Sequence, residues 1–119
     1  MCEFLRQLNV RVLIYDPFVR DDEAQQLGGE RCDLDTIFRE SDLVSLHTPL
    51  LDETRGMLQG KHFEMMKPHS VFINTARGAI IREDEMIAVL QARSDIIALL
   101  DVTYPEPPVD DSPLRTLPN

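Results

Sequence analysis

Polar residues that could do chemistry stand where the apolar runs of this sequence end. Arg77 follows the run "SVFIN" through a turn of small residues, His47 follows "LVSL", and Asp101 closes "IIALL". Glu106 comes shortly afterwards, between prolines. In α/β proteins, ligands gather at the carboxyl ends of parallel strands. An arginine fixed there could grip a carboxylate or a polarised carbonyl, because its planar guanidinium stays charged and fits carboxylate geometry.

Each of these residues also has a plain structural interpretation. A single histidine such as His47 more often makes a structural hydrogen bond than it catalyses a reaction. Glu106 between prolines is more often a solvated loop acid, and Arg77 could cap a loop and face water. Their joint placement at strand ends is what favours a functional site.

Asp16 ends another apolar run, "VRVLIYD", and is followed by Pro17. In dinucleotide-binding folds an acid at the end of a strand accepts hydrogen bonds from the adenosine ribose hydroxyls, and its charge repels the 2′-phosphate of NADP. Asp before Pro is also common turn punctuation. Both interpretations of Asp16 stay open on the sequence alone.

These residues must be positioned by alternating strands and helices. Asp33 or Asp35 can cap a helix at its start, Gly28 and Gly29 suit a left-handed helix end, and residues 82–93 begin acidic and end basic, as the helix dipole prefers. Continuous apolar strands between helices predict an α/β fold with a parallel sheet covered on both faces. We expect strands over residues 10–16, 43–49, 70–74 and 96–102, and helices over 2–8, 21–29, 33–42, 60–68 and 82–93.

Composition bounds the remaining possibilities. The 119 residues allow at most one domain, 1–119, with an irregular proline-rich tail over 103–119. A net charge of −9 argues against nucleic-acid binding and against an anionic membrane surface. Cys2 and Cys32 form no metal-ligand spacing, which predicts no metal site and a reduced, cytoplasmic protein. No apolar stretch approaches the length of a membrane span.

Three stretches of the sequence together resemble a known family. They are "DLVSLHTPLLDETRGML", "MMKPHSVFINTARGAIIRED" and "LLDVTYPEPP". In this order they are similar to the nicotinamide-binding domain of the D-isomer-specific 2-hydroxyacid dehydrogenases, and the likeness runs from about residue 3 to the end. The element "NTARG", followed at the right interval by "DV" and "EP", is a specific signal.

The resemblance implies NAD as cofactor and a small 2-hydroxy or 2-keto acid as substrate, with a role for each matching residue. Arg77 matches the arginine that holds the substrate's carboxylate and carbonyl oxygen. Glu106 matches the acid that pairs with the catalytic histidine. Asp101 matches the residue that bonds the nicotinamide carboxamide. The matching cofactor-binding residues are Asp16 for the ribose, His47, Thr48 and Pro49 along the cleft, and Thr75, Ala76 and Arg77 beside the nicotinamide.

Parts of the family pattern are not in this sequence. It contains neither the G-x-G-x-x-G turn that holds the pyrophosphate nor the family's acid/base histidine, which the resemblance puts just beyond Leu117-Pro118-Asn119. We therefore expect a partial Rossmann-type doubly wound sheet that lacks its first strand and glycine-rich turn, cut at both ends. General acid/base catalysis contributes roughly 10²–10⁴-fold, so this chain alone is expected to be almost inactive.

Local departures from the pattern matter less. Ile97 and Leu99 replace small residues, Thr103-Tyr104 replaces a Phe-acid pair, and His69 stands where a turn glycine is usual. The remaining histidine, His62, is expected at the surface together with His69. For the tail we expect no element against which Leu114 and Leu117 could be buried.

The leading hypothesis is thus a segment of an NAD-dependent 2-hydroxyacid dehydrogenase, a homodimer when intact. The alternative is a non-enzymatic NAD(H)-sensing or corepressor-like assembly module of the same fold. A phosphoacceptor receiver domain has similar length and topology but needs a lysine at a late strand end, where neither Lys61 nor Lys67 stands.

Overall fold

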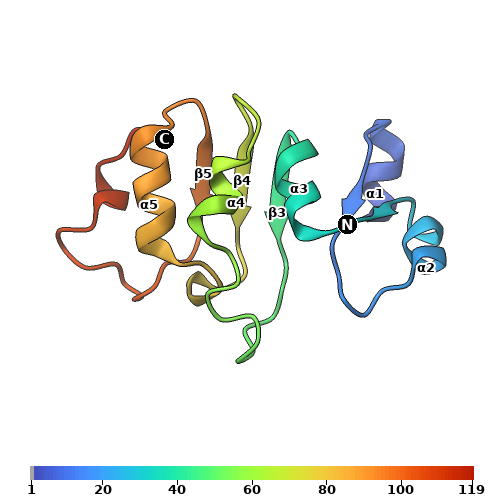
Figure 1. Ribbon diagram of the computed structural model, residues 1–119, viewed down its shortest axis with the longest axis horizontal. Coiled ribbons are helices and arrows are strands. Elements are labelled where there is room, and N and C mark those ends of the chain that lie inside the picture. The colour runs from blue at the N-terminus through green and yellow to red at the C-terminus, as the bar shows by residue number, and fades with distance from the viewer. Residues whose placement is uncertain (1) are drawn as a thin grey trace. The chain divides into compact units, whose positions relative to one another are not determined.

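The computed structural model describes residues 2–119, without the side chains of Glu3 and Arg6, and divides into two compact units. One unit ends at Ile37 and the other runs Phe38–Asn119. Figure 1 shows the order of the elements along the chain. Helix α3 (Leu34–Glu40) begins in the first unit and ends in the second. Each unit is described by itself.

The first unit contains a short parallel sheet. It holds α1 (Cys2–Leu5), a 3₁₀ turn (Arg6–Leu8), β1 (Leu13–Ile14), α2 (Asp21–Gln26) and β2 (Glu30–Arg31). β1 pairs with β2, which the sequence did not predict. The strand expected over 10–16 has only two residues and is half-buried. Its partner is equally short, and a strand extends only as far as its ladder of hydrogen bonds.

Local signals in this unit acted as expected at most positions. Asp33 caps α3, because its Oδ1 accepts a hydrogen bond from the amide of Thr36 at 2.7 Å. Gly28 follows α2 with φ of 83°, in the left-handed region that favours glycine. Gly29 instead packs closely against the side chain of Ile14.

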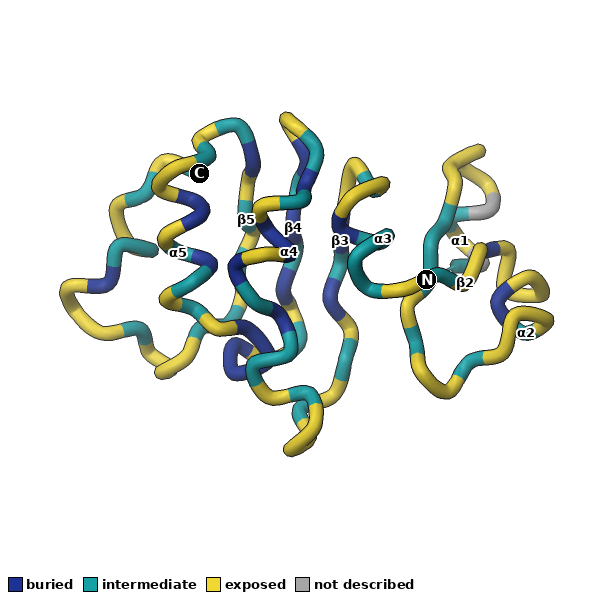
Figure 2. The backbone as a smooth tube through the Cα atoms, in the orientation of Figure 1, coloured by how far each residue is buried: buried dark blue, intermediate teal, exposed yellow. Residues whose placement is uncertain are grey.

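The second unit is built on a three-stranded parallel sheet. Its strands are β3 (Leu43–Leu46), β4 (Val71–Asn74) and β5 (Ile97–Leu100), in the order β3-β4-β5. Helix α4 (Gly60–Glu64) connects β3 to β4, and α5 (Glu83–Ala92) connects β4 to β5. The core contains Phe38, Phe63 and Phe72, with ring centroids 5.1 to 6.1 Å apart. Buried residues lie on α4, on α5 and on the strands of the sheet that these helices cover (Figure 2).

The sheet of the second unit is covered on one face only, which differs from the expected cover on both faces. Leu43, Ile97 and Leu99 remain 55%, 43% and 53% exposed, although Phe72 on the other face is buried. Parallel crossovers are nearly always right-handed. Two successive right-handed crossovers in the same direction, β3 to β4 and β4 to β5, carry α4 and α5 to the same face. The apolar residues at 97 and 99 therefore face away from both helices.

His62 is buried, which corrects the expectation that it lies at the surface. Its side chain is 3% exposed and its ring lies 5.3 Å from that of Phe38. Its Nδ1 accepts a hydrogen bond from the amide of Gln59 at 2.9 Å, which satisfies a free N–H at the start of α4. His69 is exposed, and its φ of 63° explains why a glycine would suit this turn.

The tail after β5 is irregular apart from a 3₁₀ turn (Pro113–Arg115), but it folds back onto the second unit. Leu114 and Leu117 are half-buried, against the expectation, and line a cavity of about 230 Å³ with Leu90 and Leu100. Asn119 fixes the end of the tail, because its carbonyl accepts a hydrogen bond from the amide of Ala98 at 2.8 Å.

Candidate functional site

The carboxyl ends of β3, β4 and β5 lie side by side. Leu46 is the register partner of Asn74, and Asn74 is the partner of Leu100. The next residues along the chain, His47, Thr75 and Asp101, therefore leave the sheet at one edge. This confirms the expectation that these three strands run parallel and end together. It is the edge at which ligands of α/β proteins bind.

Asn74 holds the turn that follows β4. Its side chain is fully buried. Its Oδ1 accepts a hydrogen bond from the amide of Ala76 at 2.9 Å, and its Nδ2 donates to the carbonyl oxygen of Arg77 at 3.1 Å. Its own carbonyl oxygen accepts a hydrogen bond from the amide of Asp101 at 3.0 Å. One buried amide side chain therefore shapes the turn over residues 75–77, and the same residue joins that turn to β5.

The loops after β4 and β5 touch at Gly78. A Cβ atom built on Gly78 would lie 2.1 Å from the carbonyl oxygen of Thr103 and 2.8 Å from its Cα. Real Cβ atoms do not approach backbone atoms so closely, so a glycine is required here. The contact keeps the loop that carries Arg77 against the loop that carries Asp101.

Arg77 is exposed, and its guanidinium has unused donors. Its Nη1 donates to the carbonyl oxygen of Ala76 at 2.6 Å. Among the side chains that the structure describes, no carboxylate forms an ion pair with Arg77. Since a guanidinium carries five N–H donors, most of them remain available to a carboxylate or carbonyl oxygen.

The loop after β3 is held by its own hydrogen bonds. His47 is exposed, and its Nε2 lies 2.9 Å from the hydroxyl of Ser45. Thr48 is half-buried and Pro49 is exposed. Thr54 Oγ1 donates to the carbonyl oxygen of Pro49 at 2.7 Å and closes the loop.

Two interactions at Tyr104 hold the loop after β5 in place. The amide of Tyr104 donates to Glu83 Oε2 at 2.8 Å, and the guanidinium carbon of Arg55 lies 5.8 Å from the centre of the Tyr104 ring. Asp101 and Glu106 are both exposed. The structure places Asp101 at the strand edge, while Glu106 follows in the irregular segment beyond Tyr104.

Asp16 belongs to the first unit and follows β1. Its Oδ1 accepts a hydrogen bond from the amide of Phe18 at 2.8 Å. This is the turn expected from an Asp-Pro pair, so the structural interpretation of Asp16 holds. Its second carboxylate oxygen has no hydrogen bond within the described residues.

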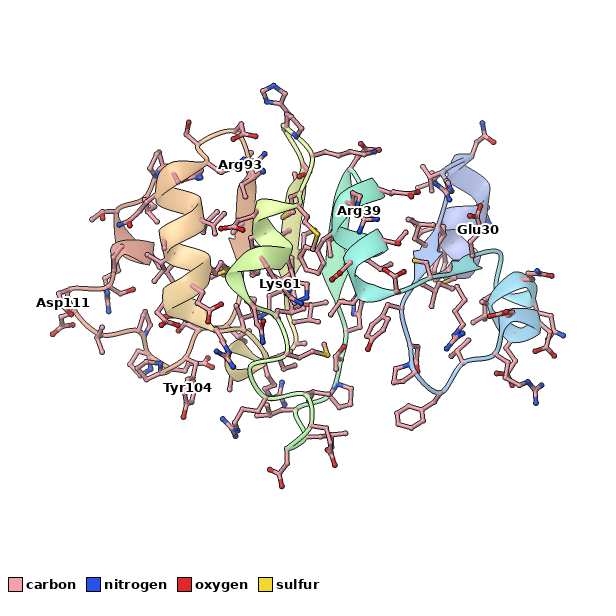
Figure 3. The ribbon with its side chains drawn as sticks, in the orientation of Figure 1. Glu30, Arg39, Lys61, Arg93, Tyr104 and Asp111 are labelled. Carbon is pink, nitrogen blue, oxygen red and sulfur yellow. The ribbon has the colours of Figure 1, made fainter. Side chains whose placement is uncertain are left out.

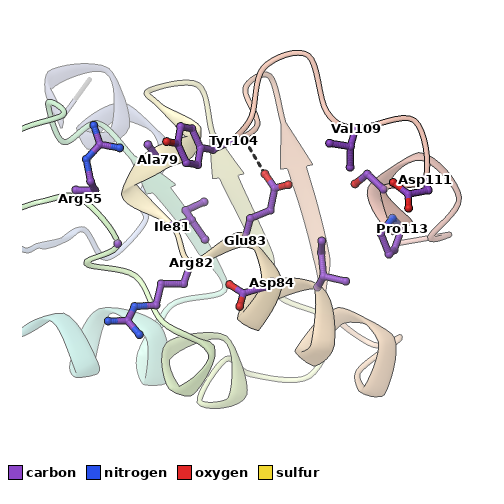
Figure 4. Close-up of a pocket in the computed structure, with 13 residues that line it drawn as sticks. Arg55, Ala79, Ile81, Arg82, Glu83, Asp84, Tyr104, Val109, Asp111 and Pro113 are labelled. Atoms are coloured by element: carbon purple, nitrogen blue, oxygen red, sulfur yellow. Dashed lines mark hydrogen bonds between the residues drawn. The ribbon is translucent and has the colours of Figure 1, made fainter.

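A cavity elsewhere in the second unit contains none of these residues. It has a volume of about 550 Å³ and lies between the start of α5 and the tail of the second unit, where Arg55, Glu83, Tyr104 and Asp111 line it (Figure 4). We place the candidate site at the strand edge rather than in this cavity, because the cavity lacks Arg77, Asp101 and every other sequence-predicted site residue.

In the second unit, the side chains with shifted pKa values, Arg93 and Asp95, lie away from the strand edge. The Arg93 guanidinium, labelled in Figure 3, hydrogen-bonds the Asp95 carboxylate and holds the pKa of Asp95 below its ordinary value. This pair precedes β5 and so lies at the amino end of the sheet. Within residues 2–119, no group of three or more His, Cys, Asp or Glu side chains is arranged to hold a metal ion.

Two residues of the site were missed by sequence reasoning. Asn74 ends an apolar run and was counted with the strand, although an amide in a buried strand signals that its side chain has partners nearby. Gly78 follows Arg77 in a stretch of small residues, and its role depends on Thr103, which lies far away in sequence. The sequence shows that the residues of this turn are small, but not that the main chain of Thr103 lies against them.

Comparison with known proteins gives a consistent result. The chain matches the family profile described as D-isomer specific 2-hydroxyacid dehydrogenase, NAD binding domain, over residues 1–119. It is 41% identical over 108 residues to glyoxylate/hydroxypyruvate reductase B of Cronobacter sakazakii. The alignment covers 90% of this chain and 33% of that protein. The first relatives that it matches are much longer, and the chain spans 22% to 34% of their length.

Solved structures agree with the sequence matches. Phosphoglycerate oxidoreductase from Vibrio cholerae O395 superposes with a TM-score of 0.88 and 31% identity, over 98% of this chain and 38% of that one. D-lactate dehydrogenase with NAD⁺ from Lactobacillus jensenii gives a TM-score of 0.76 and 32% identity, over 92% of this chain and 34% of that one. The α/β fold with parallel strands is therefore of the Rossmann type, as the sequence predicts.

Proposed function

Because the chain belongs to the D-isomer-specific 2-hydroxyacid dehydrogenase family through its NAD-binding domain, we propose that it is the NAD-binding part of an oxidoreductase acting on a 2-hydroxy or 2-keto acid. The observation that carries this proposal is the common edge of β3, β4 and β5. There the strand register brings His47, Thr75 and Asp101 to one edge. Arg77 follows in the next turn, and its guanidinium has N–H donors that are not used in hydrogen bonds.

The residues at this edge suit a nicotinamide dinucleotide. Thr75 and Ala76 are small, so a flat ring can approach the backbone between them, and Asp101 offers a carboxylate to the carboxamide. His47, Thr48 and Pro49 would line the cleft beside the cofactor. When bound, NAD(H) supplies or accepts the hydride. The glycine-rich turn that holds a pyrophosphate is not found among residues 1–119.

Asp16 would hold the ribose with the carboxylate oxygen that its turn leaves free. The same negative charge disfavours a 2′-phosphate, which supports NAD rather than NADP as the cofactor. The turn to Phe18 fixes the carboxylate, so it need not be ordered when the cofactor binds.

Arg77 is the residue that we assign to the substrate. Its exposed guanidinium can bind the carboxylate of a 2-keto acid in a bidentate way and also contact the carbonyl oxygen. Charge develops on that oxygen as the carbonyl is reduced, and a fixed cation stabilises it. Glu106 would pair with a catalytic histidine supplied from outside residues 1–119, and would orient its ring and raise its basicity. By themselves, residues 1–119 are proposed to be almost inactive.

The experiment is an assay of the full-length protein that contains this chain. NADH oxidation would be followed with glyoxylate, hydroxypyruvate, pyruvate and 3-phosphohydroxypyruvate. Removal of one donor to a developing oxyanion typically costs about 10²–10³-fold. We expect Arg77→Ala to lower kcat/KM by at least that factor. Arg77→Lys should recover only part of it, because lysine lacks the planar fork.

Arg39→Ala is the matched control. Arg39 is an exposed arginine on α3, away from the strand edge, and is labelled in Figure 3. Its replacement should leave kcat/KM unchanged. Full activity in Arg77→Ala, or no reduction of any 2-keto acid by the wild-type protein, would refute the proposed role or the proposed function, respectively.

A second candidate is an NAD(H)-sensing or corepressor-like assembly module. It is favoured by the positions of the histidines within the chain. His62 is buried in the core, His69 lies at the amino end of β4, and His47 is engaged with Ser45. Translation of the complete reading frame decides between the candidates, because a dehydrogenase needs a histidine after Asn119 and a sensing module does not.

Assembly and compartment remain part of the proposal. We propose a homodimer for the intact protein, as the family resemblance implies, and a reducing, cytoplasmic compartment. Cys2 and Cys32 are half-buried and neither is part of a disulfide, which supports a reducing environment. No helix in residues 2–119 has the length and apolar character needed to cross a membrane. Size-exclusion chromatography with light scattering would measure the oligomeric state.

A further inference from the structure

We propose that Asn74 is a positioning residue for Arg77, an inference that rests on the role proposed above for Arg77 in binding the substrate. The buried amide of Asn74 sets the turn from which the guanidinium projects. The substrate-binding geometry thus depends on a residue that does not touch the substrate.

The burial of Asn74 is the first observation. Its side chain is 0% exposed, at the end of β4 and beside the apolar core. A buried amide is costly unless its donors and acceptors are satisfied. In the described part of the chain, both ends of this amide are used within the turn that carries Arg77.

The bonds form a connected set. Asn74 Oδ1 accepts from the amide of Ala76, Asn74 Nδ2 donates to the carbonyl oxygen of Arg77, and Arg77 Nη1 donates to the carbonyl oxygen of Ala76. Asn74 therefore holds the peptide units on either side of the one between Ala76 and Arg77, and the carbonyl of that middle unit accepts from the Arg77 guanidinium. Because Cα and the first side-chain bonds follow the backbone, fixing these peptides restricts where the guanidinium can lie.

The side chain at this position must accept a hydrogen bond from the amide of Ala76 and donate one to the carbonyl oxygen of Arg77, and asparagine does both. Aspartate has the same shape but no N–H, so it would set a carboxylate oxygen against the carbonyl oxygen of Arg77. Alanine would leave the amide of Ala76 and the carbonyl of Arg77 without these partners. The main-chain carbonyl of Asn74 accepts from Asp101, so the β4–β5 ladder holds the residue in either variant.

The test uses the full-length protein and a double-mutant cycle. Misplacement of a catalytic group by about 1 Å can cost about 10²-fold. We expect Asn74→Asp and Asn74→Ala each to lower kcat/KM at least 10-fold in the wild-type background. The same substitutions should change the residual rate less than threefold when Arg77 is already alanine. A purely structural effect of Asn74 would be equally large in both backgrounds.

Ser70→Ala is the matched control. Ser70 is also buried, lies just before the other end of β4, and donates its hydroxyl to the carbonyl oxygen of Lys67 at 2.7 Å. Loss of this hydroxyl also removes a hydrogen bond of a buried side chain and so destabilises the fold, but Ser70 is remote from Arg77. We expect Ser70→Ala to lower the melting temperature without a change in the KM for the 2-keto acid.

Two measurements do not depend on turnover. Calorimetric titration should show weaker binding of oxamate to the NADH complex of Asn74→Asp, at least 10-fold, with the Kd for NADH within twofold of wild type. Hydrogen exchange at the Ala76 amide should be faster in both variants, and crystal structures should show a displaced or disordered Arg77 guanidinium.

The outcomes separate this inference from the proposed function. If Arg77→Ala abolishes activity but Asn74→Asp keeps it within threefold, the positioning role is wrong and the proposed function stands. If Arg77→Ala remains active, the substrate role of Arg77 is wrong. Hydrogen exchange at Ala76 and the position of the guanidinium then decide whether Asn74 orders the turn. An undisturbed guanidinium in Asn74→Asp would overturn the inference.

Discussion

Gly78 and Thr103 lie so close together that no side chain fits between them. A Cβ atom on residue 78 would stand 2.1 Å from the Thr103 carbonyl oxygen. The two residues follow neighbouring strands, β4 and β5, and their contact joins the loops that carry Arg77 and Asp101. The close contact between the main chains of these two loops is therefore as much a feature of the site as its charged side chains.

We predict that Gly78→Ala destabilises the second unit and displaces Arg77. The added methyl meets backbone atoms, which cannot rotate away, so one of the loops must move. Overpacking typically costs about 1–3 kcal/mol. Thermal unfolding of the full-length protein would measure the loss, and kcat/KM should fall with it. Gly60→Ala is the control, since a Cβ there would lie 3.3 Å from Glu85 Cβ and should cost less. Equal melting temperatures for the two variants would contradict the steric argument.

A second prediction separates the two interpretations of Asp16. Asp16→Asn keeps an oxygen that can accept from the amide of Phe18, but it removes the negative charge. We therefore expect an unchanged melting temperature and a lower ratio of kcat/KM for NADH over NADPH. Asp16→Ala should lower the same ratio and also loosen the turn. Steady-state assays with both cofactors measure the ratio, and an unaltered preference in Asp16→Asn would leave Asp16 with its turn role alone.

The Arg93–Asp95 pair predicts a dependence of stability on acid pH. Arg93 lowers the pKa of Asp95 first through its hydrogen bonds, against an opposing effect of burial. Since the folded-state pKa lies below the ordinary value of 3.8, the pair stabilises the fold above that pH. This stabilisation is lost as the pH falls through the folded-state pKa. Asp95→Asn should thus be less stable than wild type at pH 7, with a difference that shrinks below about pH 4.

The measurement for Asp95 is a series of urea unfolding midpoints between pH 7 and pH 2. Asp52→Asn is a suitable control, because Asp52 is exposed and makes no hydrogen bond or ion pair within the described residues. Parallel curves for wild type and Asp95→Asn across the whole range would show that the pair does not contribute through its charge.

Asn119 anchors the tail through a set of main-chain carbonyls. Its Nδ2 lies 3.0 to 3.1 Å from the carbonyl oxygens of Leu90, Arg93 and Ile96, at the end of α5 and before β5. Buried acceptors left without a donor typically cost about 1–3 kcal/mol. We predict that Asn119→Ala lowers stability by about that amount in chemical denaturation. Thr116→Ala, on the exposed part of the same tail, should have a much smaller effect.

The presence of strands β3, β4 and β5 was predictable because each apolar run is followed by a recognisable signal, although β3 and β5 end at Leu46 and Leu100, before the expected residues 49 and 102. Pro49 follows β3, and Asp101 follows β5. Asp33 and Gly28 also acted as their residue types predict, since capping and left-handed turns depend on local geometry. The placement of His47, Thr75 and Asp101 at one edge followed from a general rule of parallel sheets.

The remaining features depend on contacts between distant residues. Burial of His62 requires Phe38 beside it, and the half-burial of Leu117 requires the bonds of Asn119 to α5. The open face at Ile97 and Leu99 depends on the handedness of two connections, which apolar content alone does not reveal. Gly78 is a further case, because its neighbour is the main chain of Thr103. The partners of Asn74 are close in sequence, but they are the main-chain amide of Ala76 and carbonyl of Arg77, which have no side-chain signature.

The boundary between Ile37 and Phe38 separates Asp16 from all other proposed site residues. On the proposed roles, the first unit holds the charge that discriminates between dinucleotides, and the second holds the groups that meet the reacting atoms. Selection can therefore alter the choice of cofactor through substitutions in one unit while the aromatic cluster of Phe38, Phe63 and Phe72 preserves the other. If the proposed roles hold, cofactor preference and substrate chemistry can be redesigned independently.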